Sequence, residues 1–240
     1  RKTRRGGAVF LIEKLLAPLT DAVLFVSNFE KRTYEEKVGR PYDLHAVIYN
    51  GLSDEEFVHT ATAPDATDFL FVGTMRALKG PDLLIRALAD LREKHNQRFT
   101  TTIIGDGAEK PEFLALSDEL GMADQIRFMS GMAAREAFAL GKVMVVPSRA
   151  EAFPYIVLEA LAAGKAVLAS NVGGIPEIFG PSSPSLVEPD VEKLAAKLLV
   201  IMNDEDSFEA SMPDASRLHE RFSLQTMAHS IELVYREARS

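Results

Sequence analysis

Two glutamates, Glu151 and Glu159, are separated by seven residues in the stretch PSRAEAFPYIVLEALAAGKAVLASNVGGIPE at residues 147–177. A carboxylate pair can do two kinds of chemistry. It can act as general acid and base, as in glycoside hydrolysis, or each carboxylate can accept two hydrogen bonds side by side from vicinal sugar hydroxyls. The neighbouring residues help to decide between these two hypotheses.

The pair lies where an apolar strand is followed by a largely apolar helix. We expect Glu151 in the turn and Glu159 more than one turn inside a helix at about 154–163. Pro154 suits the first helical position, and Phe153 before it has no side-chain oxygen to cap the helix. The open first turn favours an anion, because its amide donors and the helix dipole both point at the charge.

A basic turn precedes another predicted helix. Gly73 allows a sharp exit from an apolar strand, and Arg76 and Lys79 follow just before a helix that begins at Gly80-Pro81. Two cations do not stabilise a helix N-terminus, since its dipole prefers negative charge. Their placement makes sense if an anion completes the site, and the alternative is a solvated basic turn. Glycoside hydrolysis by the two glutamates would make no use of a basic turn that binds an anion, which argues against that hypothesis.

Three further strand exits contain glycine: Gly105-Asp-Gly107, Ser130-Gly-Met-Ala-Ala134 and Asn171-Val-Gly-Gly-Ile-Pro-Glu177. The first begins like a dinucleotide fingerprint but has Lys110 where the third glycine belongs, so a tight turn is the better interpretation. The backbone near Met132 could meet a planar base. The adjacent Gly173 and Gly174 permit close approach of a ligand. Each exit is also compatible with an ordinary turn.

The composition argues against several kinds of site. The chain has no cysteine, and its five histidines are scattered with no pair at metal-ligand spacing, so we expect no metal site. Neither a P-loop motif nor the G-x-S-x-G elbow of hydrolases is present. No run of 18 uninterrupted apolar residues occurs, which argues against a membrane-spanning helix.

The net charge of −8 is unevenly distributed. Residues 1–42 hold nine basic and five acidic residues, a balance of +4, which leaves −12 for the rest. An acidic body argues against nucleic acid as a partner. The basic Arg1–Arg5 is compatible with peripheral contact to the inner face of a membrane, and more commonly with a solvated arm. Without a signal-peptide pattern or an initial Met, we expect a cytoplasmic chain that is part of a longer protein.

Short apolar strands alternate with helices from residue 68 onward. This pattern predicts an α/β fold with a doubly wound parallel sheet, in which ligands bind at the carboxyl ends of the strands. The expected strand and helix pairs are 69–72 with 81–94, 100–104 with 110–120, 126–129 with 133–140, 143–146 with 154–163, 166–169 with 175–179, and 185–187 with 191–202.

The first part of the chain predicts a separate β-α-β piece. Its elements are a strand at 21–27, a helix at 28–38 and a strand at 46–49, closed by a turn at Asn50-Gly51. The composition of 61–68 is typical of a linker. Helical apolar spacing also occurs at each end of the chain, at 10–18 and in a stripe after Phe222 that must dock on something: Leu224, Met227, Ala228, Ile231, Val234 and Tyr235.

Together these motifs resemble the C-terminal, donor-binding half of glycosyltransferase family 4, which has the GT-B fold. The resemblance covers about residues 21–240. It implies that 1–60 is the C-terminal part of an acceptor-side Rossmann domain, 61–222 a Rossmann-like nucleotide-sugar domain, and 223–240 a helix crossing back to the first domain. It rests on Gly73, Arg76 and Lys79-Gly80, on Gly105-Asp-Gly107, on Glu151 to Ala160, and on Gly173 to Glu177.

The resemblance also implies roles for individual residues. Lys79 and Arg76 would neutralise the donor diphosphate, and Glu151 would face the transferred sugar. Glu159 would bind the ribose hydroxyls, and the backbone of Met132 would meet the base. The remaining donor contacts would come from Gly73, Phe153, Pro154, Tyr155 and Ile156.

A retaining, metal-independent glycosyltransferase of the hexosyltransferase type is what the resemblance implies. Its donor would be a UDP- or GDP-sugar, with no other cofactor, and its acceptor a glycan or a lipid-linked molecule, as in polysaccharide biosynthesis. The glycine-rich loop and catalytic side chains of the acceptor domain are absent from this sequence, so we expect the chain alone to be inactive. Two alternatives stay open: a nucleotide-sugar-binding module without turnover, and a sugar-nucleotide epimerase of the same architecture.

Overall fold

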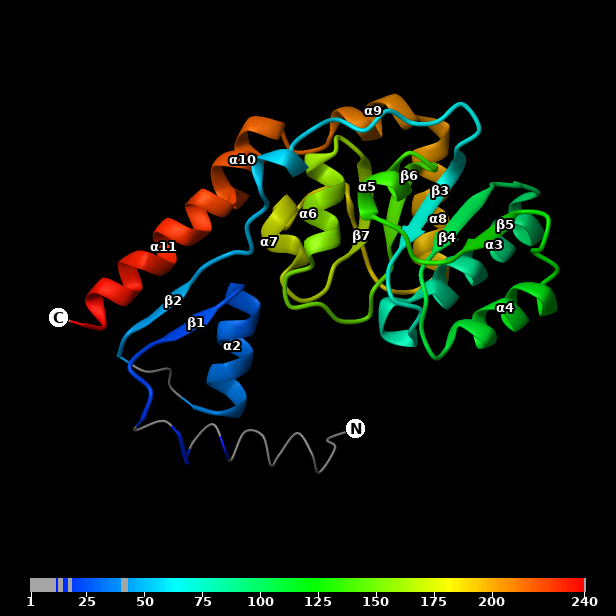
Figure 1. Ribbon diagram of the computed structural model, residues 1–240. Coiled ribbons are helices and arrows are strands. Elements are labelled where there is room, and N and C mark those ends of the chain that lie inside the picture. The colour runs from blue at the N-terminus through cyan, green and yellow to red at the C-terminus, as the bar shows by residue number, and fades with distance from the viewer. Residues whose placement is uncertain (1–11, 13–14, 17–18, 40–42, 240) are drawn as a thin grey trace.

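The computed structural model describes residues 12, 15–16, 19–39 and 43–239. Its main body is a parallel six-stranded sheet with the strand order β5-β4-β3-β6-β7-β8 (Figure 1). The order reverses between β3 and β6, which are neighbours in the sheet although β4 and β5 lie between them in sequence. Ligands bind at such switch points in open α/β sheets. The strands are β3 (Thr67–Val72), β4 (Thr101–Ile104), β5 (Ile126–Met129), β6 (Gly141–Val146), β7 (Ala166–Ser170) and β8 (Leu186–Val187).

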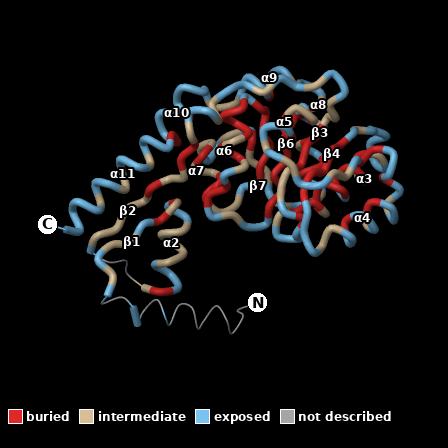
Figure 2. The backbone as a smooth tube through the Cα atoms, viewed as in Figure 1, coloured by how far each residue is buried: buried red, intermediate tan, exposed pale blue. Residues whose placement is uncertain are grey.

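Helices cover both faces of this sheet. Side chains alternate along β3, so that Phe69 and Phe71 enter the apolar cluster on one face and Leu70 the cluster on the other. The sheet is therefore buried on both sides, as the red strands of Figure 2 show, which confirms the predicted doubly wound α/β class. One face carries α3 (Pro81–His95), α4 (Lys110–Glu119) and α8 (Val191–Asn203), and the other α5 (Ala134–Phe138), α6 (Tyr155–Ala162) and α7 (Ile175–Phe179).

Two short helices were not predicted, α9 (Glu205–Ala210) and α10 (Ala215–Phe222). Phe208 is the buried residue of α9, while α10 buries Leu218 and Phe222. One or two apolar positions do not form a periodic pattern that a sequence window can detect. Both helices follow α8 and lead the chain to its last helix, α11 (Leu224–Glu237).

A second, two-stranded parallel sheet forms the N-terminal unit, made of β1 (Val23–Phe25), α2 (Asn28–Lys37) and β2 (His45–Val47). Ser27 caps α2 by accepting a hydrogen bond from the amide of Glu30. The predicted β-α-β piece is thus confirmed, with shorter strands. The predicted helix at 10–18 falls mainly on residues outside those described.

The predicted turn at Asn50-Gly51 is wrong. This segment carries the chain from the N-terminal unit to the main body, and Leu52 forms an isolated parallel bridge with Ser223. The glycine at position 51 is required by close packing, because a Cβ there would lie 2.6 Å from the carbonyl oxygen of Ser223. The amide of Leu52 donates to Phe222, and the amide of Leu224 donates back to Leu52.

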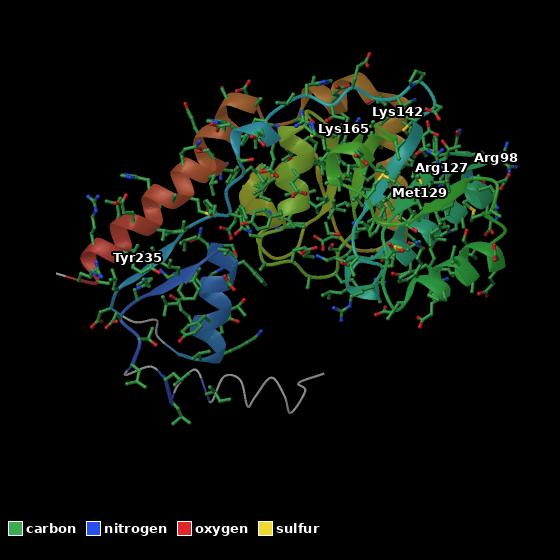
Figure 3. The ribbon with its side chains drawn as sticks, viewed as in Figure 1. Arg98, Arg127, Met129, Lys142, Lys165 and Tyr235 are labelled. Carbon is green, nitrogen blue, oxygen red and sulfur yellow. The ribbon has the colours of Figure 1, made fainter. Side chains whose placement is uncertain are left out.

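Helix α11 runs beside the N-terminal unit (Figure 1) and has no fully buried residue. Three residues of its predicted stripe, Met227, Ile231 and Val234, are only half-buried. Tyr235, labelled in Figure 3, is 67% exposed. A cavity of about 570 Å³ lies between this helix and the start of β1. The apolar stripe is therefore only partly covered within the described residues.

One carboxylate fastens the N-terminal unit to the main body. Glu177 of α7 accepts hydrogen bonds from the amides of Asn28 and Phe29 at 2.9 and 2.8 Å, from Asn28 Nδ2 at 2.8 Å, and from the hydroxyl of Tyr49 at 3.1 Å. Burial alone would raise the pKa of Glu177, but these donors outweigh it and hold that pKa below its usual value. The charged carboxylate also lies at the N-terminus of α2, where the helix dipole favours it.

Glu177→Gln is expected to loosen this attachment by about 1.5–3 kcal/mol, the range for hydrogen bonds to a charged group. Because the folded-state pKa is lowered, the stabilisation is present above the unfolded value of 4.5 and disappears as the pH falls through the folded value. Amide exchange of α2 at pH 7 and thermal unfolding between pH 7 and 2.5 measure both effects. The exposed Glu119→Gln is the control, and equal acid sensitivity of Glu177→Gln and wild type would contradict the assignment.

Candidate functional site

The candidate site lies at the carboxyl ends of β3 and β6, at the switch point of the sheet. A cavity of about 260 Å³ opens there. The turn after β3 forms one wall, and the turn after β6 together with the start of α6 forms the other. Its lining residues are Phe71, Val72, Gly73, Thr74, Lys79, Val146, Ser148, Glu151, Pro154, Tyr155 and Ile156.

Lys79 and Glu151 form an ion pair inside this cavity, with 2.7 Å between Nζ and Oε1. The hydroxyl of Ser148 donates to the same carboxylate oxygen, also at 2.7 Å. The Glu151 side chain is 8% exposed and that of Lys79 33%. Among the described residues, Oε2 of Glu151 has no hydrogen-bond donor. The carboxylate is thus fixed by one oxygen and can accept from a ligand with the other.

The two turns that carry this pair are locked together. The amide of Arg149 donates to the carbonyl of Leu78, and its guanidinium binds both carboxylate oxygens of Asp82 at 2.8 and 2.6 Å. Gly80 has a φ of +73°, and a Cβ there would lie 2.0 Å from the carbonyl oxygen of Pro147. These contacts hold the basic turn against the Glu151 turn.

The N-terminus of α6 is open, as predicted. Pro154 is its N-cap residue and makes no side-chain capping bond, so the helix begins at Tyr155, one residue later than expected. Tyr155, 46% exposed, and Ile156 both line the cavity. The free amides of the first helical turn therefore lie beside Lys79 and Glu151, which is an arrangement that attracts an anion.

Phe153 does not line the cavity. Its side chain is 4% exposed and packs with Tyr49 and Phe222 in an aromatic cluster behind the turn. Its carbonyl oxygen accepts a hydrogen bond from Asn50 Nδ2 at 2.8 Å. The phenylalanine of the motif is thus a core residue and is not among the residues that line the cavity.

Glu159 lies one helical turn further along α6, on the same side as Tyr155 and Ile156. It is half-buried and has no hydrogen-bond donor among the described residues. Burial raises the pKa of its carboxyl, and the nearby Glu56 carboxylate raises it further. Glu159 is not among the residues that line the cavity. A half-buried carboxylate without a donor, whose charged form is disfavoured, is nevertheless a candidate for ligand binding.

The remaining predicted residues are not all brought together. Gly73 lines the cavity, whereas Arg76 is exposed, precedes the single helical turn Ala77–Lys79, and is not part of the lining. Met132 is half-buried and packs against the apolar cluster that contains α6. Gly173, with a φ of +61°, approaches protein backbone, since a Cβ there would lie 1.6 Å from the carbonyl oxygen of Glu151.

Four residues with a part in this geometry were missed by the sequence analysis: Tyr49, Asn50, Ser148 and Arg149. The spacing of Ser148 and Glu151 within one turn is a signal that could have revealed their contact. Asn50 and Phe153 are 103 positions apart, so no local pattern connects them. The described residues contain no cluster of three potential metal ligands from His, Cys, Asp or Glu, and none of their helices is long and apolar enough to span a membrane.

The chain belongs to the family of glycosyl transferases group 1, whose model matches residues 53–219. Among curated proteins, it is 30% identical over 230 residues to the D-inositol 3-phosphate glycosyltransferase of Streptomyces avermitilis, covering 86% of this chain and 49% of that protein. It is 33% identical over 180 residues to the protein of that name from Corynebacterium aurimucosum, covering 71% and 43%. The chain thus spans about half the length of these relatives.

Solved structures of glycosyltransferases share its fold. Alr3699/HepE from Anabaena in complex with UDP and glucose superposes with a TM-score of 0.84 at 20% identity, covering 96% of this chain and 67% of that one. Sucrose-phosphate synthase from Thermosynechococcus elongatus superposes with a TM-score of 0.82 at 22% identity, covering 99% and 64%. The predicted membership of glycosyltransferase family 4 and the GT-B fold class are therefore confirmed.

Proposed function

We propose that this chain binds a nucleotide-diphosphate sugar and forms the donor-binding half of a glycosyltransferase. The observation that carries the proposal is the cavity at the switch point, where a lysine, an open helix N-terminus and a carboxylate with one free oxygen lie together. The lysine and the open helix N-terminus can bind a diphosphate, and the free carboxylate oxygen can accept a hydrogen bond from a sugar hydroxyl. The family membership and the UDP and UDP-glucose in related folds support this choice of ligand.

Each group has a defined task in this proposal. Lys79 and the amides of Tyr155 and Ile156 neutralise the diphosphate and stabilise it as it departs, which is the main catalytic contribution. Glu151 accepts from a hydroxyl of the transferred sugar through Oε2. Glu159 accepts from the two ribose hydroxyls, and the backbone at Met132 meets the base. Arg76 joins the diphosphate only by swinging in from its exposed position.

Turnover requires an acceptor, a glycan or lipid-linked molecule, and residues to bind it. We propose that residues 1–60 complete an acceptor-side domain, that 61–222 hold the donor, and that 223–240 return to the first domain. The two-stranded parallel β1-β2 sheet favours this scheme, because parallel strands are normally buried among further strands. In this scheme, the chain alone binds the donor without transferring its sugar. The alternative is a nucleotide-sugar-binding module that has no turnover of its own.

Isothermal titration calorimetry tests the proposal directly. UDP, GDP and their glucose and mannose conjugates are titrated separately into the chain, and we expect saturable heat with one of the two base series. A lack of binding to every nucleotide would overturn the donor assignment. Incubation with the bound donor and a panel of acceptors then tests the expected inactivity of the chain alone, which sugar transfer would refute, and mass spectrometry of the recovered nucleotide-sugar detects an epimerised product.

A further inference from the structure

We propose that Asn50 and Tyr49 are positioning residues for the diphosphate-binding start of α6. They belong to the segment that joins the two parts of the chain, and neither lines the cavity. The inference rests on the proposed function, because it assigns them to the same site. It adds that the affinity for the diphosphate is set partly from outside the cavity, by the segment that crosses from the N-terminal unit.

Asn50 controls the peptide group at the entrance to α6. Its Nδ2 donates to the carbonyl oxygen of Phe153 at 2.8 Å, and this carbonyl belongs to the peptide bond that joins Phe153 to Pro154, the N-cap residue. The hydrogen bond therefore fixes the plane of that peptide. It also keeps a partial negative charge paired with a donor that lies outside the cavity, where it does not oppose a bound anion.

Tyr49 fixes the side chain of the same residue. Its ring stacks on Phe153, with the centroids 4.8 Å apart and an interplanar angle of 19°. Phe222 packs edge-on against the Tyr49 ring, with 5.7 Å between the centroids. Phe153 is thereby held at both its carbonyl and its ring. Glu151, two residues before Phe153, and Pro154, directly after it, line the cavity, so their positions depend on this hold.

The same tyrosine reaches the carboxylate that fastens the N-terminal unit. Its hydroxyl donates to Glu177 Oε2 at 3.1 Å and accepts from Asn28 Nδ2 at 3.1 Å. The hydrogen bonds to Glu177, the stack on Phe153 and the bond from Asn50 form one continuous connection. It runs from the start of α2 in the N-terminal unit to the start of α6, which borders the cavity.

The experiment compares two ligands that differ by one phosphate. The nucleoside diphosphate that wild type binds, UDP or GDP, and its monophosphate are titrated into Asn50→Asp, Asn50→Ala and Tyr49→Leu. The exposed Asn203→Asp adds the same charge at the end of α8 and is the matched control for Asn50→Asp. In the Asp variant, a carboxylate oxygen replaces the donor and repels the Phe153 carbonyl.

We expect Asn50→Asp to weaken diphosphate binding about tenfold or more and Asn50→Ala and Tyr49→Leu about three- to tenfold, with monophosphate affinity changed less than about threefold. Equal losses for both ligands would indicate general loosening of the site and would overturn the positioning role, as would wild-type affinities in all three variants. Loss of cooperative unfolding in both Asn50 variants would count against it too. If wild type binds no nucleotide, the proposed function fails first, and this inference fails with it.

Discussion

Lys79→Ala is expected to bind a nucleoside diphosphate about 100-fold more weakly than wild type. Hydrogen bonds to charged groups contribute about 1.5–3 kcal/mol, and 1.4 kcal/mol corresponds to a factor of ten. The variant also leaves Glu151, whose side chain is 8% exposed and which lies 2.7 Å from Nζ in wild type, without its cation. That unpaired carboxylate then repels the incoming phosphates, which places the loss toward the upper end of this range.

The double variant Lys79→Ala with Glu151→Gln separates the two contributions. Removing the negative charge is expected to recover about tenfold of the lost affinity. Glu151→Gln alone frees Lys79 from its ion pair and should bind the bare diphosphate at least as tightly as wild type, while its affinity for the diphosphate-sugar falls. Calorimetry with both ligands measures these effects, and Lys193→Ala, an exposed lysine on α8, is the control. Undiminished affinity of Lys79→Ala would remove this lysine from the site.

Glu159→Gln is expected to make the ligand-free protein more stable and to weaken its binding of nucleotide about tenfold. Burial, with a smaller effect of Glu56, raises the pKa of the Glu159 carboxyl. A carboxylate with a raised folded-state pKa costs stability at neutral pH, and the cost is relieved as the pH falls through that pKa. The gain in melting temperature of the glutamine variant should therefore be largest near pH 7 and shrink toward pH 4.

Binding by Glu159 is tested with a nucleotide that lacks a ribose hydroxyl. In wild type, the 2′-deoxynucleoside diphosphate should bind about tenfold more weakly than the ribonucleotide, since a bond to a charged acceptor is lost. In Glu159→Gln the difference should be much smaller, because the amide supplies one weaker acceptor. Glu119→Gln, an exposed glutamate on α4, controls for the change of charge. If both proteins discriminate equally between the two sugars, Glu159 does not contact the ribose.

The main sheet was predictable because its strands are buried on both faces. Short apolar runs such as 143–146 and 166–169, separated by amphipathic helices, admit few architectures other than a parallel sheet. The open start of α6 was predictable for a similarly local reason, since neither Phe153 nor Pro154 has a capping oxygen. Where neighbouring residues determine the structure, the sequence pattern was sufficient.

The contacts that shape the site were not predictable from local patterns. Lys79 was expected to bind the donor diphosphate and Glu151 to face the transferred sugar, but their mutual ion pair depends on the register of β3 beside β6. Asn50-Gly51 is typical of a turn, yet here the glycine is needed because the backbone of Ser223 passes close by. Gly173 likewise serves contact with the Glu151 turn, and a residue type alone does not reveal which chain segment it will approach.

The crossing at Leu52 has a mechanical consequence. The chain passes between its two parts once near Leu52 and again near Ser223, and reciprocal hydrogen bonds join these passages side by side. Two adjacent connections act as one hinge. The N-terminal unit can rotate about this hinge, but it cannot separate from the main body there. Glu177 holds the N-terminal unit at a further point, the start of α2, and therefore restrains this rotation. Loss of these contacts would therefore allow the N-terminal unit to rotate relative to the main body.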